Sequence, residues 1–123
     1  MRKKQILLID DEPDLSDILK HQIEDAYPNY ECVSVTNGKA GVERIEQEMP
    51  DLVLLDINMP GIDGVETLRR IRQVAPKLPV AMVTGNKTPE EAKLVLELGA
   101  YDYVLKPVHF AYLKQVIFVK LGL

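Results

Sequence analysis

The sequence has little of several residue types, and each scarcity excludes a class of protein. Its single cysteine, Cys32, cannot form a disulfide within the chain, and its alternation with polar neighbours predicts a small buried core residue. The two histidines, His21 and His109, have no cysteine or carboxylate at ligand spacing, so we interpret both as surface or boundary residues. The apolar stretch 6–9 is too short for a signal-peptide core or a membrane span. We therefore expect a cytoplasmic protein that does not contact the membrane.

An excess of positive charge is also missing. The formal net charge is -4, so the overall charge does not favour direct binding to nucleic acid. The 123 residues, 46% of them hydrophobic and 28% charged, fit one globular domain with one layered core. We expect that single domain to cover residues 1–123 with no second domain in the chain, and the apolar ending 119–123 favours a domain cut from a longer protein.

Five short apolar runs alternate with longer stretches of helical periodicity. The runs predict strands at residues 5–10, 31–35, 51–56, 80–84 and 103–105. Between them, apolar residues recur at helical spacing: Leu15, Ile18, Leu19, Ile23 and Ala26; Val42, Ile45 and Met49; Val65, Leu68 and Ile71; Ala92, Val95, Leu96 and Leu98; and Leu113, Val116, Ile117 and Leu121. This alternation predicts an α/β fold, a doubly wound five-stranded parallel sheet with helices on both faces in three layers.

Acidic side chains occur where two of the predicted strands end. Asp10, Asp11 and Glu12 end the first strand, and Asp56 ends the third. In open parallel sheets, ligands bind at the carboxyl ends of the strands, so we expect these acids to share one cleft. Their mutual repulsion favours a bound cation, and an all-oxygen cluster favours a hard ion such as Mg²⁺, with Mn²⁺ as an alternative.

Two further strand ends add positive charge and a hydroxyl group. Thr84 ends the fourth strand, and Lys106-Pro107 follows the fifth. A carboxylate nucleophile, a metal, an ammonium and a hydrogen-bond donor together suit phosphoryl transfer, which depends on positioning and on neutralising the transferred oxygens. The acceptor would be a carboxylate, and the product an acyl phosphate.

These motifs carry a family resemblance over essentially the whole chain. Asp10-Asp11, the run from Leu54 to Gly64 (LLDINMPGIDG), Thr84 and Lys106-Pro107 resemble the receiver domain of a response regulator in two-component signalling. The resemblance implies a flavodoxin-like fold with strand order 2-1-3-4-5. It also implies that Asp56 accepts the phosphoryl group, that Asp11, Asp56 and the carbonyl group of Asn58 hold Mg²⁺ with Asp10 assisting, and that Thr84 and Lys106 contact the phosphoryl group.

The same resemblance implies a signalling switch, not a turnover enzyme. Thr84 would move toward the phosphoryl group and Tyr103 would rotate inward behind it, changing the face formed by residues 88–98, 101–106 and 110–121. The implied partners are a sensor histidine kinase or a histidine phosphotransfer protein, an output domain or other target, and a second copy of the chain through that face. A cis Lys106–Pro107 peptide bond is implied as well.

Some readings stay open. Glu12 could bind metal through water or help to start the first helix, and Asp10 and Asp11 could be turn residues before Pro13. A haloacid-dehalogenase-like phosphatase also uses an aspartate nucleophile and Mg²⁺, but it has a second acid two residues later, where this chain has Asn58. A flavodoxin-like cofactor binder would place small residues where Asp10 to Glu12 would repel a phosphate. A phosphorylation-independent module usually lacks one of the site residues, and none is missing here.

Overall fold

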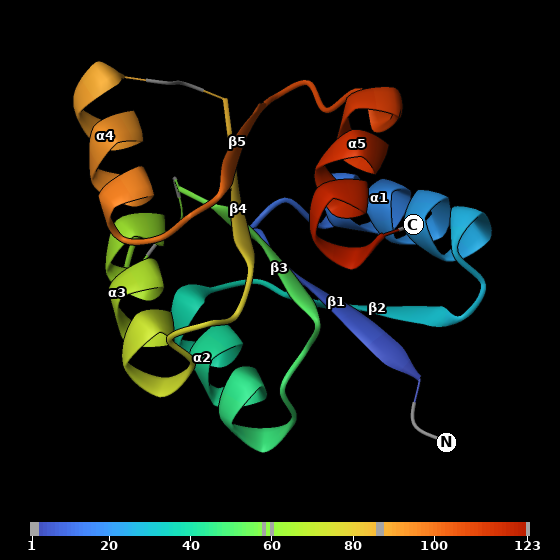
Figure 1. The fold of residues 1–123 in the computed structure, drawn as a ribbon, viewed down its shortest axis with the longest axis horizontal. Helices are drawn as coiled ribbons and strands as arrows, with labels where there is room; N and C mark the ends of the chain where they lie inside the picture. The colour runs from blue at the N-terminus through green and yellow to red at the C-terminus, as the bar shows by residue number, and fades with distance from the viewer. Residues whose placement is uncertain (1–2, 58, 60, 86–87, 123) are drawn as a thin grey trace.

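The computed structural model describes residues 3–57, 59, 61–85 and 88–122, and it shows strands and helices in strict alternation (Figure 1). The strands are β1 (Lys4–Ile9), β2 (Tyr30–Val35), β3 (Leu52–Asp56), β4 (Val80–Thr84) and β5 (Asp102–Leu105). The helices are α1 (Pro13–Ala26), α2 (Gly38–Gln47), α3 (Gly64–Val74), α4 (Pro89–Glu97) and α5 (Phe110–Leu121). Within the described chain, no helix has the length and apolar character that a membrane span requires.

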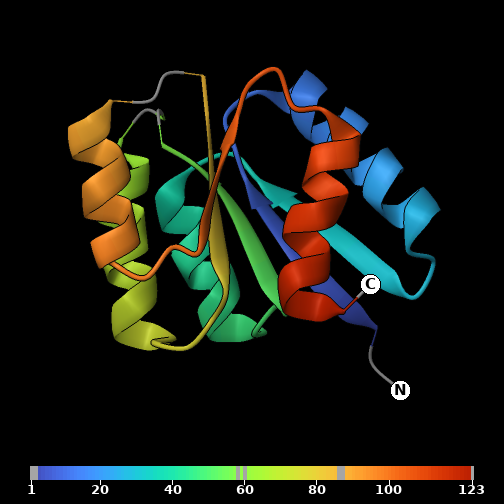
Figure 2. The ribbon, with the colours of Figure 1, turned by 45° about the horizontal axis from the view of Figure 1, so that its top comes forward.

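All strand pairs are parallel, and the sheet order is β2-β1-β3-β4-β5, which confirms the predicted topology. Helices α1 and α5 cover one face of the sheet, and α2, α3 and α4 cover the other (Figure 2). Because every crossover returns the chain to the same end of the sheet, all five strands point their carboxyl ends toward one edge. That edge carries the site.

Alternation along the strands divides the interior into two cores, one on each face of the sheet. Leu7 and Ile9 of β1 face the core that α2, α3 and α4 cover, whereas Ile6 and Leu8 face the core under α1 and α5. Cys32 is 1% exposed and belongs to the second core, as predicted. Strands buried on both faces explain the continuous apolar runs in the sequence.

Local sequence explains where the helices begin. The side chains of Asn37, Asp63 and Thr88 each accept a hydrogen bond from the backbone N–H three residues later, at 2.8, 2.9 and 3.2 Å. Pro13 and Pro89 occupy the first turns of α1 and α4, where a missing N–H costs nothing.

The structure corrects several details of the predictions. Asp10 and Asp51 lie outside β1 and β3, although Asp10 N–H still donates to Val35 O at 3.1 Å. Asp51 uses a carboxylate oxygen to accept from Gln5 N–H at 2.7 Å. Three apolar residues expected in the core are instead exposed: Ile18 (56%), Met49 (45%) and Leu96 (53%). Ile18 and Leu96 lie at the edge of the apolar face of their helices, and Met49 lies beyond the end of α2. Side chains in these positions face water.

Candidate functional site

Three acidic side chains meet around the ammonium group of Lys106. This residue directly follows β5, and its Nζ lies 2.8 Å from Glu12 Oε1, 3.3 Å from Asp56 Oδ2 and 3.4 Å from Asp10 Oδ2. The contacts join the carboxyl ends of β1, β3 and β5, as the parallel topology predicted. The Lys106–Pro107 peptide bond is cis, as the family resemblance implied.

Four carboxylates form a cluster at this edge. Asp10, Asp11, Glu12 and Asp56 each offer one oxygen, and these oxygens all lie within 4.8 Å of one another. Asp56 is 2% exposed and Asp10 is 7% exposed, so two of the negative charges have lost most of their water. One lysine cannot balance four carboxylates, and an oxygen-only donor set suits a hard divalent ion. The residues therefore fit Mg²⁺ or Mn²⁺.

The pKa values show the cost of burying these charges. Burial raises the pKa of the Asp10 carboxyl, against a hydrogen bond from Glu12 N–H and the charge of Lys106, which both lower it. For Lys106, burial alone would lower the pKa, but the hydrogen bond to Glu12 and the charges of Asp10 and Asp56 outweigh burial and raise it. Lys106 is thus held as a cation.

Glu12 contributes in a way that the sequence did not reveal. It occupies the N-cap position of α1, yet its side chain makes no capping hydrogen bond and turns instead to Lys106. The Asp10 carboxylate takes over part of the helix start, because its Oδ1 accepts from Glu12 N–H at 2.8 Å. No sequence signal within α1 could have indicated a partner 94 positions away.

A glycine fixes the backbone beneath Asp56. Gly64 N–H donates to Ile57 O at 2.7 Å at the start of α3, and a Cβ on Gly64 would overlap the carbonyl oxygen of Asp56 and the Cα of Ile57. From sequence, Gly64 belonged only to a loop motif. The structure shows that the close approach of α3 to the end of β3 requires glycine at this position.

Thr84 and Tyr103 lie on the strands next to the acidic cluster. Thr84 ends β4 and is fully buried, and its carbonyl oxygen accepts from Lys106 N–H at 2.8 Å. Tyr103 is half-buried on β5 and packs against the core on the α4 side of the sheet. Burial, together with the charge of Glu91 on α4, raises the pKa of its hydroxyl. Asn58, the remaining predicted ligand, lies outside the described residues.

The comparisons with known proteins agree on one family. The model of the response regulator receiver domain matches residues 6–118. The "Probable C4-dicarboxylate response regulator DctR" of Bacillus subtilis (strain 168) is 36% identical over 113 residues, which are 92% of this chain and 50% of that protein. The alkaline phosphatase synthesis transcriptional regulatory protein PhoP of the same organism is 35% identical over 104 residues, which are 85% of this chain and 42% of that protein. The chain thus spans about half the length of these relatives or less.

A solved structure supports the same assignment. The CheY-like receiver domain protein of Methanospirillum hungatei JF-1 superimposes with a TM-score of 0.92 at 32% identity, over 98% of this chain and 95% of that one. These matches do not favour the haloacid-dehalogenase-like phosphatase. The chain belongs to the response regulator receiver domain family, whose members are signalling switches in two-component systems.

Proposed function

We propose that this domain accepts a phosphoryl group on Asp56 from a phosphohistidine of a sensor kinase or a histidine phosphotransfer protein. The observation that carries the proposal is the contact of Lys106 Nζ with Asp56 Oδ2 at 3.3 Å inside a cluster of four carboxylates. A buried carboxylate paired with a fixed cation is poised to act as a nucleophile, and the remaining acids supply the oxygen ligands of a metal site.

The proposed metal site uses Asp11, Asp56 and the carbonyl oxygen of Asn58, with Asp10 assisting. Bound Mg²⁺ would neutralise charge on the transferred oxygens. Mn²⁺ has similar ligand preferences and is expected to substitute for it.

The chemical step needs little from the protein beyond placement. A carboxylate oxygen of Asp56 forms the new P–O bond while the bond between phosphorus and the imidazole nitrogen of the donor breaks. Lys106 stabilises negative charge on the transferred group, and the Thr84 hydroxyl donates a hydrogen bond to it. Lys106 already contacts Asp56 before transfer, so it has only a short distance to move.

The readout that we propose is a change in the face made by α4, β5 and α5. Thr84 and Tyr103 occupy neighbouring strands, with Thr84 opposite Leu105 and Tyr103 opposite Met82 in the β4–β5 register. A Thr84 hydroxyl drawn toward the phosphoryl group would leave space that the Tyr103 ring can enter. If the phosphoryl group binds this arrangement of the face more tightly than the other, the population shifts toward it by the difference in binding free energy. The face would control an output domain or another target, and it would also support a homodimer.

Phosphoryl incorporation tests the acceptor. With Mg²⁺ and a small phosphodonor, intact-mass measurement should show the addition of one phosphoryl group to the wild-type protein and to Asp25→Asn, a control on the exposed part of α1. Asp56→Asn should show none. Incorporation into Asp56→Asn, or none into the wild-type protein, would refute the assignment. Steady turnover of a phosphate ester would instead support the phosphatase alternative.

A further inference from the structure

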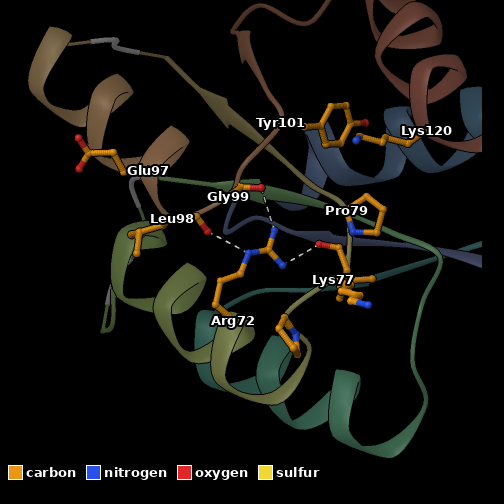
Figure 3. Close-up of a pocket in the computed structure, with 10 residues that line it drawn as sticks. Arg72, Lys77, Pro79, Glu97, Leu98, Gly99, Tyr101 and Lys120 are labelled. Carbon is orange, nitrogen blue, oxygen red and sulfur yellow. Dashed lines mark hydrogen bonds between the residues drawn. The ribbon is translucent and has the colours of Figure 1, made fainter.

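The side chain of Arg72 joins the C-terminal ends of two helices. On the α4 side, its Nε donates to Leu98 O at 2.9 Å and its Nη2 donates to Gly99 O at 3.0 Å. On the α3 side, its Nη1 donates to Ala75 O at 3.1 Å and to Leu78 O at 2.7 Å. Figure 3 shows the guanidinium group between the end of α4 and the loop that leads to β4.

Every acceptor that the described chain gives to Arg72 is a backbone carbonyl oxygen. Carbonyl groups at the C-terminal end of a helix lack intrahelical donors and carry partial negative charge, so a cation stabilises them. Arg72 meets this need for α3, where Ala75 is the C-cap residue, and for α4, where Leu98 is the C-cap residue. A planar group with several N–H donors can reach these separate acceptors at once, whereas an ammonium group cannot match its shape.

Gly99 is adapted to this contact. Its φ of +90° lies in the left-handed region, and a Cβ at this position would come within 2.9 Å of Arg72 Nε. The same residue therefore ends α4 and opens the approach for the guanidinium group.

The rest of α4 is held weakly. Val95 is its only buried side chain within Pro89–Glu97, and Leu96 on the same helix is 53% exposed. At the other end, Thr88 caps the helix through a 3.2 Å hydrogen bond from Glu91 N–H. The Thr88 hydrogen bond lies within α4 itself, so with so little apolar burial the charge-assisted hydrogen bonds from Arg72 carry much of the attachment of α4 to the rest of the domain.

We propose that Arg72 is a positioning residue for the face made by α4, β5 and α5. Arg72 anchors the C-terminal end of α4, so that this helix responds to the phosphorylation site by moving at its N-terminal end. The movement rests on the proposed function, whereas the anchor does not. Thr88, at the N-terminal end of α4, follows Thr84 by four positions in the chain, so the end of α4 that Arg72 does not hold is the end nearer to the site. Within the described residues, Arg72 makes no hydrogen bond or ion pair with Asp56 or the acidic cluster, so it acts through the helix.

Amide hydrogen exchange on the full chain tests the anchor without any phosphoryl analogue. Arg72→Lys keeps the charge but loses the fork of donors, and Arg72→Gln loses both. In both variants, exchange at the Leu98, Gly99 and Ala100 amides should accelerate by about tenfold, the effect expected for the loss of one or two charge-assisted hydrogen bonds. Core amides such as Leu54 should change by less than about twofold if the loss is local. Arg70→Gln is the matched control, because in the described part of the chain the Arg70 side chain pairs only with Glu66 on its own helix.

Beryllium fluoride with Mg²⁺ tests the direction of movement. In the wild-type protein, amide shifts should be larger at residues 88–93 than at residues 96–100, and in Arg72→Lys they should spread to residues 96–100. Unchanged exchange at residues 98–100 in both variants, or acceleration shared equally by the core, would overturn the anchor. Wild-type amide shifts as large at residues 96–100 as at residues 88–93 would overturn the proposed movement of α4 at its N-terminal end. If the Asp56 amide did not respond at all, the proposed function and the movement built on it would fail, and the exchange result would still decide the anchor.

Discussion

Lys106 Nζ lies closer to Glu12 Oε1, at 2.8 Å, than to Asp56 Oδ2, at 3.3 Å. The Glu12 side chain is 57% exposed at the rim, whereas that of Asp56 is 2% exposed. In the proposed transfer, an incoming phosphoryl group would therefore compete with an accessible carboxylate for Lys106.

Removing this competitor should strengthen binding of a phosphoryl analogue. At saturating Mg²⁺, Glu12→Gln should bind beryllium fluoride about two- to fivefold more tightly, because an exposed ion pair contributes up to about 1 kcal/mol. Titration followed by the Asp56 amide shift measures the affinity. Glu46→Gln, an exposed position on α2, is the control. Equal or weaker binding by Glu12→Gln would show that the carboxylate assists the site.

Gly64→Ala should damage both the fold and the acceptor. The added methyl group would push against the backbone of Asp56 and Ile57, so we expect a loss of roughly 1–3 kcal/mol in the free energy of unfolding. Urea denaturation measures this loss. Phosphoryl incorporation should fall as well, because the Asp56 backbone must shift. Gly85→Ala is the stability control, since a Cβ there meets nothing within 4 Å. Equal stability of the two variants would contradict the packing described for Gly64.

Tyr101→Phe should weaken the attachment of α5 to the rest of the domain. The hydroxyl of Tyr101 donates to Val116 O at 2.7 Å, and Lys120 Nζ lies 5.0 Å from the centre of the ring. Losing the hydrogen bond should lower the free energy of unfolding by about 1 kcal/mol. In Tyr112→Phe, which breaks an exposed 3.2 Å contact with Asp102, the change should be under about 0.5 kcal/mol. Chemical denaturation distinguishes the two variants, and reversal of their order would contradict this account.

Cys32 should make stability depend on alkaline pH. Burial, with a smaller effect from Glu24, raises the pKa of its thiol from 9.0 to about 12. Above pH 9 the folded state keeps the thiol proton that the unfolded state releases. The contribution of Cys32 to the free energy of unfolding is therefore complete below pH 9 and is lost as the pH rises toward 12. Relative to Cys32→Ala, the free energy of unfolding of the wild-type protein should fall by about 1.4 kcal/mol per pH unit between pH 9 and pH 12. Parallel denaturation curves for the two proteins would contradict the shift, as would rapid reaction of the native thiol with a disulfide reagent at pH 8.

The sequence predicted the architecture because the strands are buried on both faces and the turns carry glycine, proline and capping residues. It predicted the meeting of Asp10, Asp56 and Lys106 because parallel strands bring their carboxyl ends to one edge. The end of the first strand was predicted one residue too late. Asp10 keeps a hydrogen bond to the neighbouring strand, but its side chain turns to the start of α1.

Features that depend on tertiary distance could not be predicted. Arg72 has the periodicity of an ordinary polar residue on α3, and its two acceptors at the end of α4, Leu98 O and Gly99 O, become visible only when α4 is packed beside it. Leu96 and Ile18 show the opposite error, since an apolar residue on a helix indicates burial only if another element covers it. The roles of Asp11, Asn58, Thr84 and Tyr103 in binding and switching remain predictions.

The parallel sheet also governs when the site can exist. Glu12 and Lys106 are 94 positions apart, and the side-chain cluster that contains them draws on the first, third and last strands of the sheet. No hairpin or other local fragment can assemble a part of this cluster that holds both the carboxylates and the ammonium group. During synthesis, a chain whose last strand has not yet paired lacks Lys106 at the cluster, so competence to receive a signal would arise only when folding is complete.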